Sequence, residues 1–116
     1  MSGDGDSFPV RVEFLGKFIG EWDLGRGDYR AFQIGPIVEV VAIGETQGNV
    51  RVKLAASAIA VFPPEYALLF FTPEIVLPAQ IPFVVSASFR ASEPVGKIVI
   101  RDADGRHDVP VDQSPT

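Results

Sequence analysis

The sequence lacks cysteine altogether and has a single histidine among its 116 residues. The absence of cysteine excludes a disulfide framework, a thiolate nucleophile, an iron–sulfur cluster and a zinc site with cysteine ligands. A single histidine also excludes a metal site that needs several histidines from one chain. We therefore expect neither a metal nor a cofactor.

Residues that favour helices are scarce, with six leucines, three lysines and one methionine. Fifteen valines, nine isoleucines and nine phenylalanines favour strands instead. Ten prolines and eleven glycines interrupt the chain about every five or six positions, which leaves no room for several long helices. One such interruption, Gly25–Asp28, is interpreted as a flexible turn. The composition predicts an all-β domain.

The sequence has neither a basic excess nor a long hydrophobic run. Fifteen acidic and ten basic residues give a net charge of −5, and the basic residues are dispersed singly. Binding to nucleic-acid phosphates needs a basic stripe, so we expect no nucleic-acid partner. No run reaches the roughly 18–20 apolar residues that span a bilayer, so we expect no membrane span.

The two ends of the chain differ from its middle. Residues 1–7 are acidic and small, where a signal peptide has a basic start and then an apolar stretch. We interpret them as a disordered lead-in, and we expect the protein in the cytoplasm or in a larger particle. Residues 113–116 are predicted to be a frayed tail, which leaves residues 8–112 as a single β-domain of ordinary size.

Alternation of apolar and polar residues is the strongest structural signal. In Val10–Phe14 and Val50–Leu54, three apolar side chains fall on one face of a strand and two charged ones on the other. In Ile81–Phe89, residues 83, 85, 87 and 89 share the apolar face. Turn residues separate these segments, and a hairpin is predicted to join Ile37–Ile43 to Val50–Leu54.

Eight or nine strands at a spacing of roughly 8–12 residues predict an antiparallel β-sandwich, with a closed β-barrel as the alternative. Pro110 lies between Val109 and Val111, as is typical of an edge strand or of the last piece of one. Residues 55–62 suit either a short helix, because alanine favours helices, or a strand. We favour the strand because the elements that follow are apolar and β-like.

The stretch from Pro78 to Val111 resembles the later strands of bacterial immunoglobulin-like modules. An apolar strand at Ile81–Phe89 precedes the loop Arg90–Val95, the strand Lys97–Ile100 and the Asp-rich turn Asp102–Gly105. The resemblance covers about a third of the chain and implies an immunoglobulin-like sandwich, although the Cys…Trp…Cys pattern of antibody domains is absent. Modules of this kind typically serve as spacers, adhesion units or decorations on surfaces and virus particles.

An apolar segment in the middle of the chain carries the main functional prediction. Ala67–Phe71 is apolar on both faces of a strand, and a small sandwich has no second layer to cover the outer face. We expect a subunit or partner to cover it, while a helix or a barrel interior that buries both faces within one chain is the alternative. The predicted interface residues are Ile59, Val61, Phe62, Tyr66, Leu68, Leu69, Phe70, Phe71, Ile75 and Leu77.

The function expected from these observations is that of a non-enzymatic structural or interaction subunit. It would self-associate as a homo-oligomer or dock on a protein partner, for instance as a component of a virion or of a surface assembly. An alternative is a β-domain that binds a carbohydrate or another small molecule. Its platform would be the aromatic residues Trp22, Tyr29 and Phe32, although a core position is commoner for a lone tryptophan.

A hydrolase or metal-dependent enzyme around His107 is the third interpretation. His107 follows a turn and has Asp104 and Asp108 beside it in the sequence, so it could act as a general base or as a metal ligand. No serine lies in a Gly-x-Ser-x-Gly motif. We therefore favour an exposed turn histidine without partners, and we predict no catalytic residue.

Overall fold

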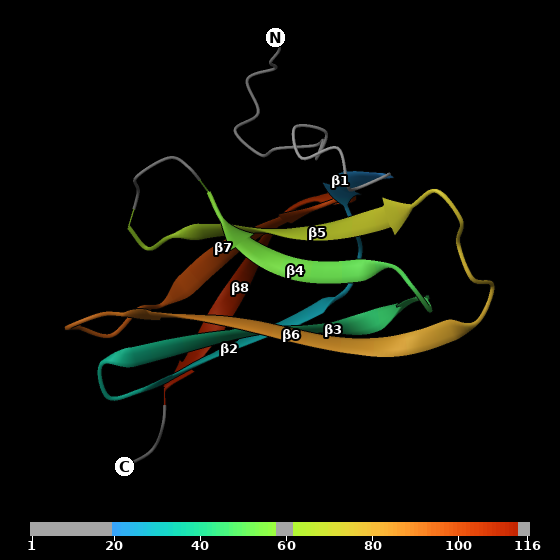
Figure 1. Cartoon of the computed structure of the whole chain (residues 1–116). Coiled ribbons are helices and arrows are strands. Elements are labelled where there is room, and N and C mark those ends of the chain that lie inside the picture. Colours follow the sequence, from blue (N-terminus) through green and yellow to red (C-terminus); the bar gives the residue numbers. More distant parts are fainter. Residues whose placement is uncertain (1–19, 58–61, 114–116) are drawn as a thin grey trace, which may run out of the picture.

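The computed structural model describes residues 20–57 and 62–113, and these residues form eight strands and no helix (Figure 1). The prediction of an all-β fold is confirmed. The predicted lead-in and the strand Val10–Phe14 lie outside the described residues. The strands are β1 (Gly20–Leu24), β2 (Asp28–Ile34), β3 (Ile37–Gln47), β4 (Arg51–Ala56), β5 (Glu65–Pro73), β6 (Gln80–Arg90), β7 (Lys97–Asp102) and β8 (Gly105–Gln113).

The strands form one curled, mixed sheet that resembles an open half-barrel. The order is β1-β5-β7-β8-β2-β3-β6, and β4 also pairs with β5. Figure 1 shows β4 and β5 in an upper layer, β2, β3 and β6 in a lower layer, and β7 and β8 crossing between the two. The pairs β2–β8 and β5–β7 are parallel, so the prediction of a purely antiparallel fold is wrong.

Strand β8 connects the two layers, and Pro110 marks the place where it changes partner. Residues 105–110 pair with β7, whereas Val111–Gln113 pair with β2. Proline has no N–H to donate, which suits a position between two ladders. Among the described residues, Pro110 pairs only with Lys97 of β7, so the expected edge position fits this part of the strand, while β8 as a whole has β7 and β2 as neighbours. Gln113 ends this strand, and its side chain donates to the Val95 carbonyl at 3.0 Å, so it is not part of a frayed tail.

The predicted hairpin between Ile37–Ile43 and Val50–Leu54 does not form. Strand β3 extends to Gln47 and pairs with β6, while β4 pairs with β5 in the other layer. The turn after Gln47 carries the chain from the lower to the upper layer, where Leu54 of β4 packs against the core cluster that contains Val38 and Val40 of β3. Burial of both inner faces takes the place of a local ladder. In the segment 55–62, Ala55 and Ala56 belong to β4, and residues 58–61 lie outside the described part.

The core lies between the layers and collects the inward side chains of both. Val38 and Val40 from β3 and Ile98 and Ile100 from β7 are at most 1% exposed. In β6, half-buried and exposed residues alternate over residues 83–90, as the sequence predicts. One cluster of buried core residues consists of Ala31, Val38, Val40, Tyr66, Ala91, Val95, Ile98, Ile100, Val109 and Val111. Within the described part of the chain, the other buried hydrophobic residues are Ala42, Ala67, Leu68, Leu69 and Phe71.

Gly25 is a close-packing position and not the flexible turn that the sequence suggested. It is buried, its N–H donates to the Leu68 carbonyl at 3.0 Å, and its carbonyl accepts from the Ala103 N–H at 2.8 Å. A methyl group on Gly25 would overlap the ring of Phe70. The backbone passes directly beneath this ring, so the residue has to be glycine for reasons of space.

We predict that Gly25→Ala lowers the free energy of unfolding by about 1–3 kcal/mol, because the added methyl group overpacks the core. The matched control is Gly96→Ala, since a Cβ at Gly96 has no heavy atom within 4 Å and its φ is ordinary. That control should change stability by less than about 1 kcal/mol. Urea unfolding of both variants tests this, and equal stabilities would contradict it.

Candidate functional site

Four of the ten predicted interface residues are buried by the chain itself. Tyr66, Leu68, Leu69 and Phe71 are 4%, 0%, 1% and 7% exposed, although they alternate between the two faces of β5. On the side of β5 that carries Leu69 and Phe71, Trp22 of β1 packs against Phe71 with 5.3 Å between the ring centroids. The chain therefore covers both faces of this strand, and the side chains of these four residues are not available to a partner.

The other predicted interface residues are in different environments. Phe70 is half-buried and packs edge-on against Phe83 at 5.5 Å. Phe62, Ile75 and Leu77 are exposed by 67%, 76% and 51%. Ile59 and Val61 lie outside the described residues.

The loop between β5 and β6 presents two exposed large hydrophobic side chains, Ile75 and Leu77, from a fixed backbone. The Asn49 side chain donates to the Ile75 carbonyl at 2.6 Å and accepts from the Leu77 N–H at 2.9 Å. Ile75 and Leu77 are therefore exposed on a tethered loop.

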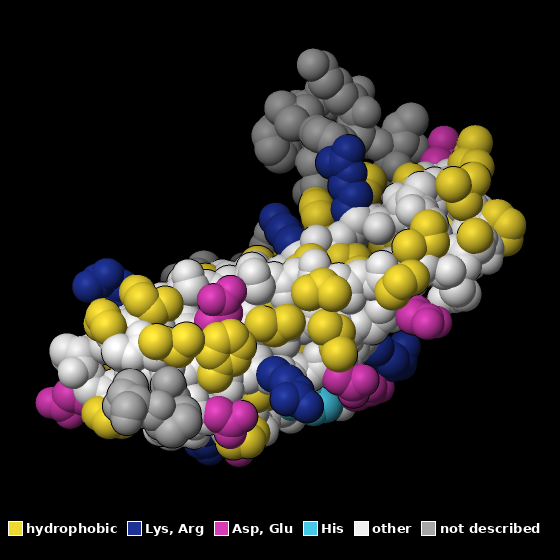
Figure 2. Space-filling model, turned by 90° about the horizontal axis from the view of Figure 1, so that it is seen from below, with side chains coloured by type: hydrophobic (Ala, Val, Ile, Leu, Met, Phe, Trp, Pro, Cys, Tyr) yellow, Lys and Arg dark blue, Asp and Glu magenta, His cyan; other side chains and the backbone are white. Residues whose placement is uncertain are grey.

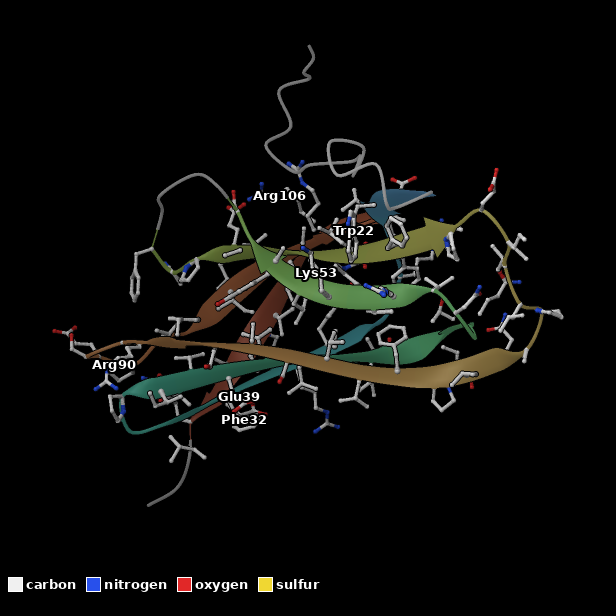
Figure 3. The ribbon with its side chains drawn as sticks, in the orientation of Figure 1. Trp22, Phe32, Glu39, Lys53, Arg90 and Arg106 are labelled. Atoms are coloured by element: carbon white, nitrogen blue, oxygen red, sulfur yellow. The ribbon has the colours of Figure 1, made fainter. Side chains whose placement is uncertain are left out.

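The three aromatic residues of the predicted ligand platform do not come together. Figure 3 shows Trp22 above the upper layer and Phe32 on the underside of the lower layer. The Lys53 ammonium lies 4.6 Å from the centre of the Trp22 ring and occupies the stacking position. Tyr29 is half-buried, and its hydroxyl donates a hydrogen bond to Asp102. A sugar could not stack on all three rings at once.

His107 has partners, contrary to the expectation of an isolated turn histidine. Its Nε2 lies 2.8 Å from Oδ1 of Asp102, and its ring centroid lies 5.6 Å from that of Tyr29. Asp102 is only 3% exposed and also accepts the Asp104 N–H at 2.8 Å. The carboxylate beside the histidine is thus Asp102, and neither Asp104 nor Asp108 takes this place.

The acidic neighbours that the sequence suggested for His107 are paired elsewhere. Asp104 accepts from Arg26 Nε at 3.0 Å, and Asp108 accepts from Lys97 Nζ at 3.0 Å. The register of the β7–β8 hairpin explains the different partner, because Ile100 pairs with His107 and Asp102 lies two residues further along the same face. Combining the predicted turn with strand alternation could have identified this pair.

Hydrogen bonding sets the charge states in this polar network. Burial alone raises the pKa of the Asp102 carboxyl, but the hydrogen bonds from Tyr29, the Asp104 N–H and His107 outweigh it and hold this pKa below its ordinary value. Burial and the hydrogen bond to Asp102 raise the pKa of the Tyr29 hydroxyl. At neutral pH the network therefore holds an ionised Asp102 and a neutral Tyr29.

The network can orient a histidine, and each of its named contacts also stabilises the fold. His107 uses one ring nitrogen for Asp102, which leaves the other for a proton or a ligand. Among the residues that the structure describes, no three histidine, aspartate or glutamate side chains gather as a metal-binding group. The arrangement resembles the orienting half of a general base, built into the hairpin that joins the two layers.

The underside of the lower layer exposes an apolar band that sequence reasoning missed. Phe32, Ile34, Ile43 and Val84 are exposed by 37%, 57%, 43% and 70%. Figure 2 shows hydrophobic side chains spread along this face. We define the outer face as the outward residues Arg30, Phe32, Ile34, Ile37, Glu39, Val41, Ile43, Val84, Ser86, Ser88 and Arg90.

The orientation of β2 explains why this band was missed. Its polar residue Gln33 points inward and is 4% exposed, while its apolar neighbours Phe32 and Ile34 point outward. The Gln33 amide is satisfied by the carbonyls of Gly35 and Glu93, each at 3.2 Å, and by the Val95 N–H at 2.9 Å. Residues sixty or more positions away thus help to decide which face of β2 is buried.

Comparison with known proteins identifies no relative. No protein family matches the chain, and neither a curated protein nor a solved structure matches it. Within the described ranges, no helix is long and apolar enough to cross a membrane. The geometry of the chain is therefore the basis for any functional proposal.

We predict that Asp102→Asn lowers the free energy of unfolding at pH 7 by about 1–3 kcal/mol, because the ionised carboxylate loses its charged hydrogen bonds. The native pKa of Asp102 lies below its ordinary value of 3.8, so its contribution is present above about pH 4 and is lost as pH falls through the native pKa. The difference between wild type and variant should therefore shrink towards pH 3. Urea unfolding at pH 7, 5 and 3 measures it.

The matched control for this prediction is Asp108→Asn. Asp108 makes an exposed ion pair with Lys97, so its loss should cost less than about 1 kcal/mol at pH 7. A difference between wild type and Asp102→Asn that stays constant from pH 7 to 3 would contradict the assigned role of the carboxylate.

Proposed function

We propose that the protein is a non-enzymatic structural or interaction subunit that self-associates through an exposed face of its curled sheet. The observation that carries this proposal is the apolar band on the outer face. Burial of apolar surface is worth about 25 cal/mol per Å², so exposed phenylalanine, isoleucine and valine side chains favour association. The proposed role is that of a component of a larger assembly, such as a virion or a surface structure.

The shape of the surface supports a protein partner. The outer face is formed by the three adjacent strands β2, β3 and β6. Strand β3 pairs with β2 on one side. On its other side, β3 pairs with β6 along eleven residues. Such a face offers contacts spread over a broad surface, as protein interfaces use, and its polar rim matches their composition. The proposed interface is therefore the outer face of β2, β3 and β6, in place of the region around the buried strand β5 that the sequence suggested.

The exposed residues of the interface predicted from the sequence, Phe62, Ile75 and Leu77, do not belong to the outer face. Phe62 lies beside Phe89 with 5.8 Å between ring centroids, at the opposite side of the molecule from the tethered loop of Ile75 and Leu77. These side chains are apolar and accessible, but they lie at two ends of the molecule and do not form one surface.

We predict that the purified protein has a mass in solution of at least twice its 12.5 kDa chain mass at micromolar concentration. Light scattering behind a sizing column measures this mass over a dilution series. Dissociation on dilution is expected, because the exposed apolar area is modest. A strict monomer at every concentration up to about 100 μM would overturn the proposed self-association.

A further inference from the structure

The end of the outer face nearest the Gly35–Pro36 turn combines exposed apolar residues with charges of both signs. Phe32 pairs with Glu39, which pairs in turn with Ser88. In the next row, Ile34 pairs with Ile37, which pairs with Arg90. Figure 3 shows Phe32, Glu39 and Arg90 on this part of the molecule. Asp112 of β8 pairs with Phe32 at the same end. We call the residues Arg30, Phe32, Ile34, Glu39, Arg90 and Asp112 the turn-end patch.

The charges of the turn-end patch are balanced and have no ion-pair partners within the described residues. Arg30 and Arg90 carry two positive charges, while Glu39 and Asp112 carry two negative ones. Some exposed charges elsewhere on the surface do pair, as Lys97 does with Asp108 at 3.0 Å. Glu39 is half-buried beside Phe32, so its unpaired carboxylate is placed where an external cation would be held.

A surface with both signs of charge and no net charge is complementary to itself. A twofold axis places each patch against its own copy, so that every contact occurs twice and opposite charges can face each other. Beyond the other end of the outer face, the next outward positions of β2 and β3 are Asp28 and Glu45, which are exposed. Stacking two copies there would oppose like charges, so the axis belongs at the turn end.

We infer that the turn-end patch is a twofold interface between two copies of this chain, in which Glu39 of each copy faces Arg90 of the other. This inference rests on the proposed function. Phe32 and Ile34 supply the apolar centre of the contact. The charges at its edge set the register of the two sheets, because a register that faces Glu39 with Arg90 is favoured over one that opposes like charges.

A charge swap tests this arrangement by sedimentation equilibrium, with far-UV circular dichroism to confirm the fold of each variant. Glu39→Arg and Arg90→Glu should each weaken self-association by about tenfold or more, because each creates two like-charge contacts per dimer. The double variant Glu39→Arg/Arg90→Glu should restore the dissociation constant to within about threefold of wild type. Single variants that weaken association without rescue by the swap would overturn the Glu39–Arg90 contact.

Two isoleucine variants test the position of the interface. Ile34→Asp should abolish self-association, since Ile34 is 57% exposed within the patch. Ile75→Asp is the matched control, because Ile75 is 76% exposed on the distant tethered loop, and it should associate like wild type. If wild type associates and Ile34→Asp does too, this interface is wrong while the proposed function stands. If wild type is a monomer, both are wrong.

Discussion

The fold depends on burying the inner sides of two layers that a single strand connects. Strand β8 pairs with β7 up to Pro110 and with β2 from Val111, so it belongs to both layers. Its inward residues Val109 and Val111 are 5% and 7% exposed and pack in the same core as Ile98 and Ile100. Without this strand, each layer would expose one apolar face to water, which is unfavourable for a small sheet.

The same hairpin that holds the layers together also contains the polar network. Asp102 ends β7 inside the molecule, where it accepts hydrogen bonds from Tyr29 of β2 and from the Asp104 backbone. A buried carboxylate is tolerated only with such partners, because an unpaired one would cost several kcal/mol. The network therefore ties β2 to the β7–β8 hairpin, and its histidine is explained by this structural role.

The outer face has the opposite character, because its apolar residues are exposed. It follows from the way β2 is held, with Gln33 bonded inward to the backbone of residues 93–95. Once Gln33 points inward, Phe32 and Ile34 must point outward, since neighbouring side chains of a strand alternate. The surface proposed for association is thus a consequence of a hydrogen-bonded glutamine on the other side of the strand.

Local features could be predicted from the sequence because neighbouring residues determine them. The all-β class, the turn at Asp102–Gly105 and the alternation in β6 follow from turn chemistry and from a period of two residues. Long-range pairing could not be predicted in this way. The choice of β6 over β4 as the partner of β3, and the burial of both faces of β5, depend on contacts between distant segments.

The sequence by itself determined that this chain forms strands between closely spaced turns and has no thiol chemistry. The tertiary structure decided which side of each strand is buried, which carboxylate meets His107 and which apolar residues remain accessible. The physical reason is that strand alternation defines two faces but does not select one. The selection is made by burial between the two layers and by hydrogen bonds such as those of Gln33 and Asp102, whose partners in the loop at residues 93–95 and in β2 are far away in the chain.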